Sequence, residues 1–165
     1  MIAGRAVLLV IAMSVLTSAL RAQGHAPVRA EVRIDATAAD VQHLELGGGA
    51  AVPVGTYVRL AFLAGAGVAR SDAREATGDG HGTAARADVI ARFQVDPFHQ
   101  SARGLYGGAG ASYLAARGER GRVYLALVAG IELRDRGHVA PALEVALGGG
   151  VRVGFALRRA ATGWR

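Results

Sequence analysis

Residues 28–36 read Val-Arg-Ala-Glu-Val-Arg-Ile-Asp-Ala, so apolar and charged side chains alternate there without interruption. Successive side chains of an extended strand point to opposite faces, which places the apolar residues on one face and the charged residues on the other. An amphipathic helix would instead repeat its apolar residues about every 3.6 positions. The stretch therefore predicts a β-strand with one apolar and one charged face.

The same alternation recurs in seven further stretches, of which the fourth is the weakest because it is rich in Gly and Ala. They are residues 41–52, 57–70, 84–95, 105–116, 122–134, 139–147 and 151–158. The breaks between them carry turn residues and are mostly short; the first is 37–40 and the longest is 71–83. Short breaks favour antiparallel hairpins. We therefore predict an all-β fold, an eight-stranded antiparallel up-and-down barrel, whose closure removes exposed sheet edges.

The first 22 residues do not share this pattern. Arg5 is followed by an uncharged, mostly apolar run over residues 6–20, and Ala22 offers a small residue for cleavage. This order is typical of a secretory signal peptide. The run is short for a membrane-spanning helix, which needs about 20 residues. We therefore expect a signal peptide over residues 1–22 and a barrel domain over residues 23–165.

Composition excludes several function classes. The 165 residues include no Cys, which rules out a disulfide scaffold, a thiolate metal site and a Cys nucleophile. The five His have no metal-ligand spacing, and no phosphate-loop or nucleophile-elbow motif is present, so we expect no metal and no cofactor. The formal charge of +6 comes from arginines that alternate with acids and form no basic stripe. Nucleic-acid binding is therefore not expected.

The charged faces of the predicted strands suit a narrow lumen. Their arginines and carboxylates nearly balance, and the positions between them are mostly Gly and Ala, which a water-facing surface does not need. The interior of an eight-stranded barrel is only wide enough for side chains, so charges there must be paired. We expect the apolar face to contact lipid and the charged face to fill the lumen. The predicted lumen charges are Arg29, Glu31, Arg33, Asp35, Glu45, Arg59, Arg86, Asp88, Arg92, Glu132, Arg134, Glu144, Arg152 and Arg158.

Two stretches carry a resemblance to a known group. They are Leu-Tyr-Gly-Gly-Ala-Gly-Ala-Ser-Tyr over residues 105–113 and Leu-Glu-Val-Ala-Leu-Gly-Gly-Gly-Val-Arg-Val-Gly-Phe over residues 143–155. Together with the alternation over residues 28–159, they make the chain resemble the small bacterial outer-membrane β-barrels of the OmpA-like and OmpX-like group. The resemblance implies an outer-membrane location, contact with outer-membrane lipid, insertion by the barrel-assembly machinery and a monomeric state. Aromatic residues make up only 5% of the chain, so interfacial aromatic girdles are expected to be thin.

These observations predict a non-enzymatic, porin-like envelope protein with a structural or surface role and no wide pore. The alternative is a soluble periplasmic, lipocalin-like barrel that binds an apolar ligand inside. The two differ in whether Arg92 and Glu132 point into the barrel or into solvent. A third possibility, a lipid hydrolase, would need a Ser and a His near the membrane edge, and Ser71 with His81 is the loop pair to test.

Overall fold

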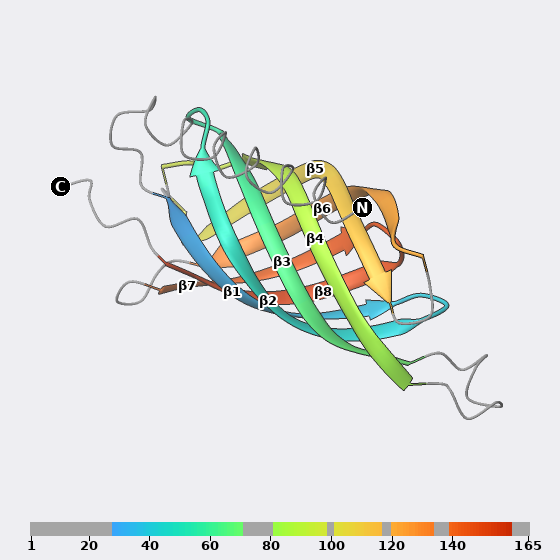
Figure 1. Ribbon diagram of the computed structural model, residues 1–165. Coiled ribbons are helices and arrows are strands. Elements are labelled where there is room, and N and C mark those ends of the chain that lie inside the picture. The colour runs from blue at the N-terminus through green and yellow to red at the C-terminus, as the bar shows by residue number, and fades with distance from the viewer. Residues whose placement is uncertain (1–27, 71–80, 99–100, 117–119, 134–138, 160–165) are drawn as a thin grey trace.

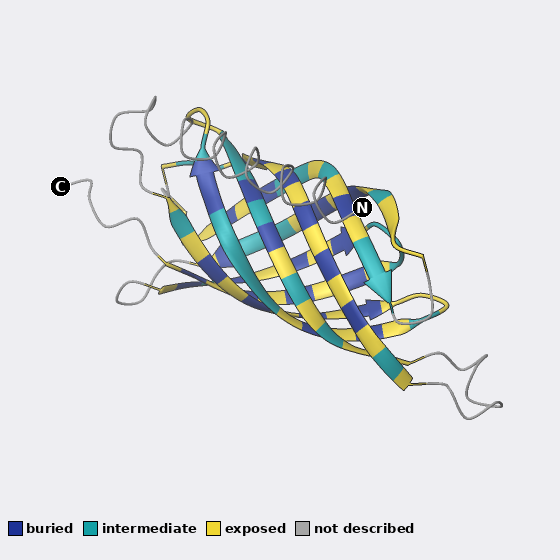
Figure 2. Cartoon of the chain, in the orientation of Figure 1, coloured by how far each residue is buried: buried dark blue, intermediate teal, exposed yellow. Residues whose placement is uncertain are grey.

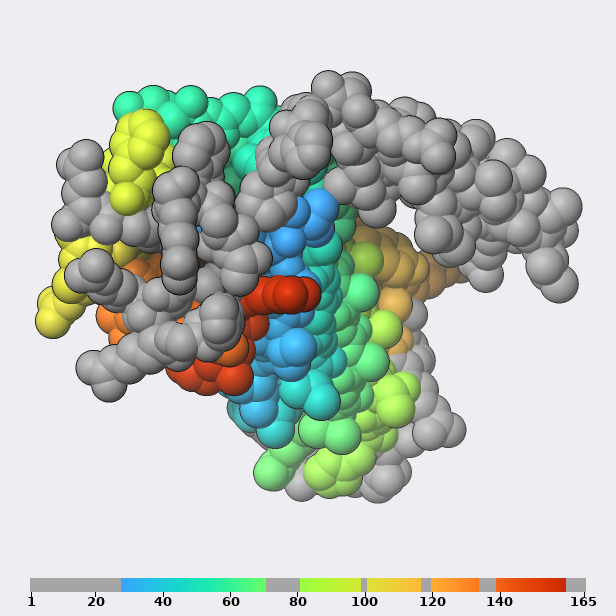
Figure 3. Space-filling view, turned by 90° about the vertical axis from the view of Figure 1, so that its left-hand side faces the viewer, coloured from blue at the N-terminus to red at the C-terminus, as the bar shows by residue number. Residues whose placement is uncertain are grey.

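The strands of the protein form one closed barrel, as a computed structural model shows for residues 28–70, 81–98, 101–116, 120–133 and 139–159. Each strand pairs antiparallel with its neighbour in the chain, and β1 pairs with β8 to close the barrel (Figure 1). In Figure 3, β8, β1 and then β2 to β4 lie side by side as a continuous outer wall. The strands are β1 (Arg29–Ala38), β2 (Gln42–Pro53), β3 (Val58–Arg70), β4 (His81–Gln94), β5 (Arg103–Ala116), β6 (Arg122–Leu133), β7 (Val139–Leu147) and β8 (Val151–Arg159).

All eight predicted stretches are strands, although several of their bounds shift by one to three residues, most clearly at the end of β1 and at the start of β4. β1 continues through Thr37, which was expected in a break, because Thr37 pairs with His43 of β2 and Arg152 of β8. β4 begins at His81 instead of residue 84, so the connection expected over 71–83 is shorter than predicted. The reason is that β4 pairs with β3 as far as the pair of Arg70 and His81. Backbone hydrogen bonds between strands extend β4 there, and local sequence does not reveal them.

Gly110 explains why residues 105–116 form a full strand despite their weak pattern. A Cβ at Gly110 would fall on the carbonyl oxygen of Val89 in the neighbouring strand. Glycine therefore permits β4 and β5 to approach closely, and the ladder between them runs from Ala84 to Gln94. The backbone hydrogen bonds of that ladder replace the side-chain packing that a Gly-rich strand lacks.

The two faces of the barrel wall differ in character, as the alternating bands of Figure 2 show. Apolar side chains point outward, with Leu125 73% exposed and Val123 71% exposed. Charged side chains point inward, and Arg92 and Glu132 are each only 2% exposed. Small residues fill the positions between the buried charges, among them Ala61 and Ala126. Among the described residues, the wall is thus apolar outside and charged inside.

The two ends of the barrel are distinguished by their connections. We call basal the end where β1 begins, which also holds the β2–β3 turn over residues 54–57, and apical the end that holds the β7–β8 turn over residues 148–150. At the basal end the rings of Tyr57 and Phe93 stack with their centroids 5.7 Å apart, and both side chains are exposed. This pair is an aromatic contact at one edge of the apolar outer surface.

The first 27 residues lie outside the described part of the chain, so the signal peptide over residues 1–22 stays a prediction. Within the described ranges, no helix has the length and apolar character needed to cross a membrane.

Candidate functional site

The lumen of the barrel is the candidate site, because charged side chains from seven strands meet there. Every predicted lumen charge except Arg134, which lies outside the described residues, faces inward. Arg29 and Arg59 are half-buried at the basal end, and the others are buried. The described lumen charges are seven arginines (Arg29, Arg33, Arg59, Arg86, Arg92, Arg152, Arg158) and six carboxylates (Glu31, Asp35, Glu45, Asp88, Glu132, Glu144).

Glu31 of β1 lies at the centre of the network. Its Oε2 accepts hydrogen bonds from Arg92 Nη1 at 2.7 Å and from Arg158 Nε at 3.0 Å. Its Oε1 accepts from Arg33 Nη1 at 3.2 Å and from Arg92 Nη2 at 3.2 Å. Both oxygens of this buried carboxylate are therefore satisfied by guanidinium groups from β1, β4 and β8.

Glu144 of β7 is the second central carboxylate. Its Oε1 accepts a hydrogen bond from Arg33 Nη2 at 2.9 Å, and its Oε2 accepts from Arg92 Nη2 at 3.0 Å. Arg33 also binds Asp35 with two parallel hydrogen bonds of 2.6 and 2.8 Å. Such bidentate contacts fix the plane of the guanidinium group as well as its position.

Tyr106 of β5 is a lumen residue that sequence reasoning missed. Its hydroxyl donates to Glu144 Oε2 at 3.0 Å and accepts from Arg158 Nη2 at 2.9 Å. The Arg158 guanidinium carbon also lies 4.7 Å from the centroid of the Tyr106 ring. The alternation of the sequence could have identified Tyr106 as a lumen residue. Tyr106 lies two residues before Gly108, so it shares the inward face of a strand that is otherwise mostly Gly and Ala.

Near the basal end, Glu132 of β6 joins two arginines. Its Oε1 accepts from Arg29 Nη1 and its Oε2 from Arg158 Nη1, both at 2.9 Å. Arg158 thus contacts Glu31, Glu132 and Tyr106 at once. It links the basal pairs to the central cluster.

The apical half of the lumen holds two further pairs, one of which is joined to the central cluster by Arg152 Nη2, 3.9 Å from Glu144 Oε1. Arg86 Nε donates to Glu45 Oε2 at 2.8 Å, and Arg86 Nη2 donates to the hydroxyl of Thr37 at 3.0 Å. Arg152 Nη1 donates to Asp88 Oδ2 at 2.6 Å. Thr37 is a second residue that sequence reasoning missed, because residues 37–40 were expected to form a break.

Comparison with solved structures identifies the architecture. The crystal structure of Neisserial surface protein A superposes with a TM-score of 0.58 at 14% identity, over 80% of this chain and 94% of that chain. A transmembrane β-barrel designed de novo superposes with a TM-score of 0.55 at 14% identity, over 83% of this chain and 97% of the design. The chain has the fold of the small outer-membrane β-barrels. No protein-family model matches the sequence, and no curated protein sequence matches it significantly.

An outer-membrane barrel fold accounts for the direction of the two faces. In such barrels the outward face is apolar and meets lipid, while the interior is polar. A soluble barrel with an apolar ligand would need the opposite arrangement. Here the interior is formed by groups such as Arg92 and Glu144, and Leu125 lies on the outside.

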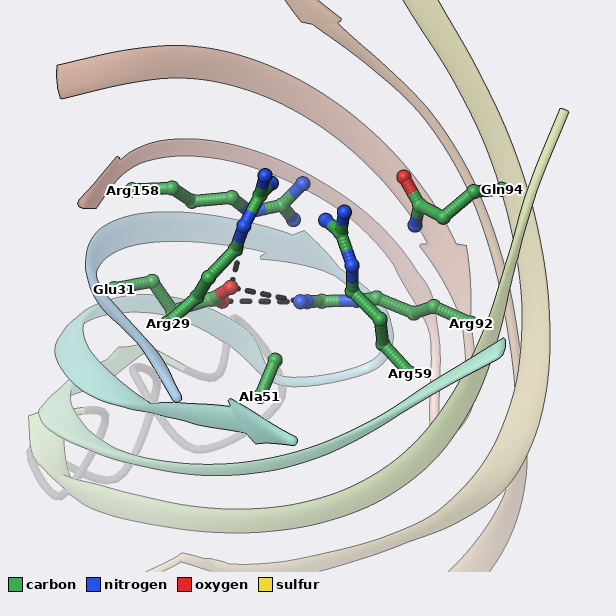
Figure 4. Close-up of a pocket in the computed structure, with 7 residues that line it drawn as sticks. All are labelled: Arg29, Glu31, Ala51, Arg59, Arg92, Gln94 and Arg158. Atoms are coloured by element: carbon green, nitrogen blue, oxygen red, sulfur yellow. Dashed lines mark hydrogen bonds and ion pairs between the residues drawn. The ribbon is translucent and has the colours of Figure 1, made fainter. Parts of the chain in front are cut away.

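The barrel carries a recess at its basal end, which we call the basal recess. It is narrow, because the space that the centre of a water molecule can reach measures about 10 Å³, room for roughly one water. Figure 4 shows the side chains around it. Its lining residues are Arg29, Glu31, Ala51, Arg59, Arg92, Gln94 and Arg158.

Other candidate chemistry receives no support from the described residues. They contain no group of three or more His, Asp or Glu side chains arranged to hold a metal ion. Ser71 lies outside the described residues, so its pairing with His81, an exposed residue at the start of β4, stays untested.

Proposed function

We propose that this chain is a non-enzymatic outer-membrane β-barrel protein of the bacterial envelope, with a structural or surface role and a lumen plugged by its arginine–carboxylate network. The observation that carries the proposal is that the barrel wall is charged on its inner face and apolar on its outer face. Arg92 and Glu132 are each 2% exposed inside, whereas Leu125 is 73% exposed outside. In water this apolar outer surface would be exposed to solvent, which is unfavourable, whereas in a bilayer it contacts lipid tails of the same character.

The same proposal covers location and partners. The barrel reaches the outer membrane through the signal peptide over residues 1–22 and the barrel-assembly machinery. It contacts lipid with its outer wall as a monomer and binds no nucleic acid. The basal end, where β1 begins, then faces the periplasm, and the apical end faces the outside of the cell.

The alternative, a periplasmic barrel with an apolar ligand inside, finds no support in the interior. Such a ligand needs a concave site with a mostly apolar lining. Two recesses of the lumen are lined by arginines, Arg29 and Arg59 in one, Arg86 and Arg152 in the other.

The test of location is heat-modifiable gel mobility of the chain after envelope fractionation. We expect the chain in the outer-membrane fraction, and we expect it to migrate differently in cold detergent and after boiling. A chain in the soluble periplasm without such a shift would overturn the proposal.

A pair of substitutions tests which face meets lipid. Leu127 and Val123 both lie on the outward face of β6, but Leu127 is closer to mid-strand and Val123 is next to the apical end. In liposomes we expect Leu127→Arg to destabilise the barrel by about 2–4 kcal/mol and Val123→Arg by about 0–1 kcal/mol, because the cost of a lipid-facing arginine depends on its depth. Equal effects of the two substitutions on the urea unfolding midpoint would contradict a lipid-facing wall.

A further inference from the structure

The basal recess is lined by four arginines but by few carboxylates. Arg29, Arg59, Arg92 and Arg158 surround it, and Glu31 is the single carboxylate among the described lining residues. A buried or half-buried charge is costly unless an opposite charge accompanies it. The charge balance of the recess therefore depends on which of these arginines Glu31 and its neighbours neutralise.

The nearby carboxylates are already engaged by other arginines. Glu31 binds Arg92 and Arg158, and Glu132 binds Arg158 and Arg29. Arg59 forms no hydrogen bond and no ion pair with any residue in the described ranges. It is the described lumen arginine without a directly bound carboxylate, and the charge of Glu132 acts on it only across a longer distance.

The strand register makes the position of Arg59 more unfavourable still. Arg59 of β3 lies directly across from Arg92 of β4, and like charges at directly paired positions repel. In Figure 4 the Arg59 guanidinium points to the same side of the recess as those of Arg29 and Arg158. Three guanidinium groups thus gather on one side of the recess, with the Gln94 side chain opposite.

The interior of the recess holds about one water, but the half-buried Arg29 and Arg59 present donors that match an oxyanion at its mouth. A guanidinium group is planar and presents several N–H donors in a fixed fork, which matches the oxygens of a phosphate group, and hydrogen bonds between two charged groups are stronger than neutral ones. The Gln94 amide adds a neutral donor that can also bind an oxygen. A bound anion would supply the negative charge that Arg59 lacks.

We propose that the mouth of the basal recess is a binding site for a phosphate-class oxyanion, with Arg59 as its principal ligand and Arg29 and Arg158 beside it. Free phosphate and the phosphomonoester headgroup of a lipid share this chemistry. The site does not depend on the proposed envelope role, since it would exist in any environment that leaves the basal end accessible.

The experiment is calorimetric titration of the full chain folded in lauryl maltoside, a detergent without phosphate. Inorganic phosphate is added at constant ionic strength, with sodium chloride replacing it in the blank. In a second arm, dihexanoyl phosphatidate is compared with dihexanoyl phosphatidylcholine, which lacks the monoester. The variants are Arg59→Gln and, as a matched control, Arg103→Gln, which removes one basal positive charge from an exposed position that does not line the recess.

We expect saturable binding of phosphate to the wild type, weakened roughly tenfold or more by Arg59→Gln and unchanged by Arg103→Gln. Binding of phosphatidate alone, with the same dependence on Arg59, would support the site and assign it to a lipid headgroup. Absence of saturable binding in both arms would overturn the proposal. So would equal weakening by both substitutions, or none by Arg59→Gln in a variant that retains heat-modifiable mobility.

Discussion

Single glutamates in the central and basal lumen each neutralise more than one arginine. Glu31 accepts from Arg33, Arg92 and Arg158, and Glu132 accepts from Arg29 and Arg158. Forming a buried ion pair brings little net stability, because desolvation offsets the attraction, but removing one partner leaves an uncompensated charge. Loss of one such glutamate therefore affects several arginines together.

Glu132→Ala tests this dependence. The substitution leaves Arg29 Nη1 and Arg158 Nη1 without their carboxylate, and we expect it to lower the free energy of unfolding by about 3–5 kcal/mol. The measurement is the urea unfolding midpoint in micelles. Asp40→Ala is the control, since it removes a carboxylate from the exposed β1–β2 turn, and we expect a change within about 0.5 kcal/mol. An unchanged midpoint for Glu132→Ala would count against an inward, paired Glu132.

At the scale of elements, the β7–β8 turn depends on glycine. Gly149 has φ +76°, a left-handed conformation that glycine adopts without strain, and a Cβ there would lie 2.9 Å from a ring carbon of Tyr124. Gly148 and Gly150 also have positive φ values. This turn sets the register of β7 against β8, and with it the inward direction of Glu144.

We expect Gly149→Ala to destabilise the barrel by about 1–2 kcal/mol, from the left-handed backbone and the contact with Tyr124. Gly55 in the β2–β3 turn is the matched control, because a Cβ there would meet nothing within 4 Å. Gly55→Ala should leave stability unchanged or raise it slightly. Thermal unfolding in micelles distinguishes the two, and similar losses for both would show that the turn conformation is not what matters.

The sequence predicts the elements well and their partners poorly. Strict alternation in residues 28–36 and 122–134 reveals both strand and face, because a period of two leaves no other regular structure. Alternation cannot reveal that Arg92 meets Glu31 and Glu144, since that depends on how the strands stagger around the closed barrel. The same limit hides the basal recess, whose imbalance appears only when the register places Arg59 beside Arg92.

At the scale of the whole molecule, the filled lumen determines permeability. Glu31 and Arg92 meet near the barrel axis from β1 and β4, and both are buried. We expect the wild type to show no steady conductance in planar bilayers. The double variant Glu31→Ala with Arg92→Ala keeps the charge balance, removes both side chains and should conduct in discrete steps. Arg103→Gln, which changes a charge outside the lumen, is the control and should stay silent.

Two results would contradict a plugged lumen. One is steady conductance of the wild type at the level of an open channel. The other is a silent double variant that still shows heat-modifiable mobility, because such a barrel would be folded and yet closed without its central pair.

The bonds from Arg92 to Glu31 and Glu144 join β4 to β1 and β7, strands that are not neighbours in the sheet. A flat, open sheet cannot make them, so they form as the sheet curls and the barrel closes. Interactions that are absent from the folding transition state control the rate of unfolding and leave the rate of folding almost unchanged. Arg92 therefore affects how long the barrel survives once it has closed, and loss of this contact would leave the rate of closure almost unchanged and shorten the lifetime of the closed barrel.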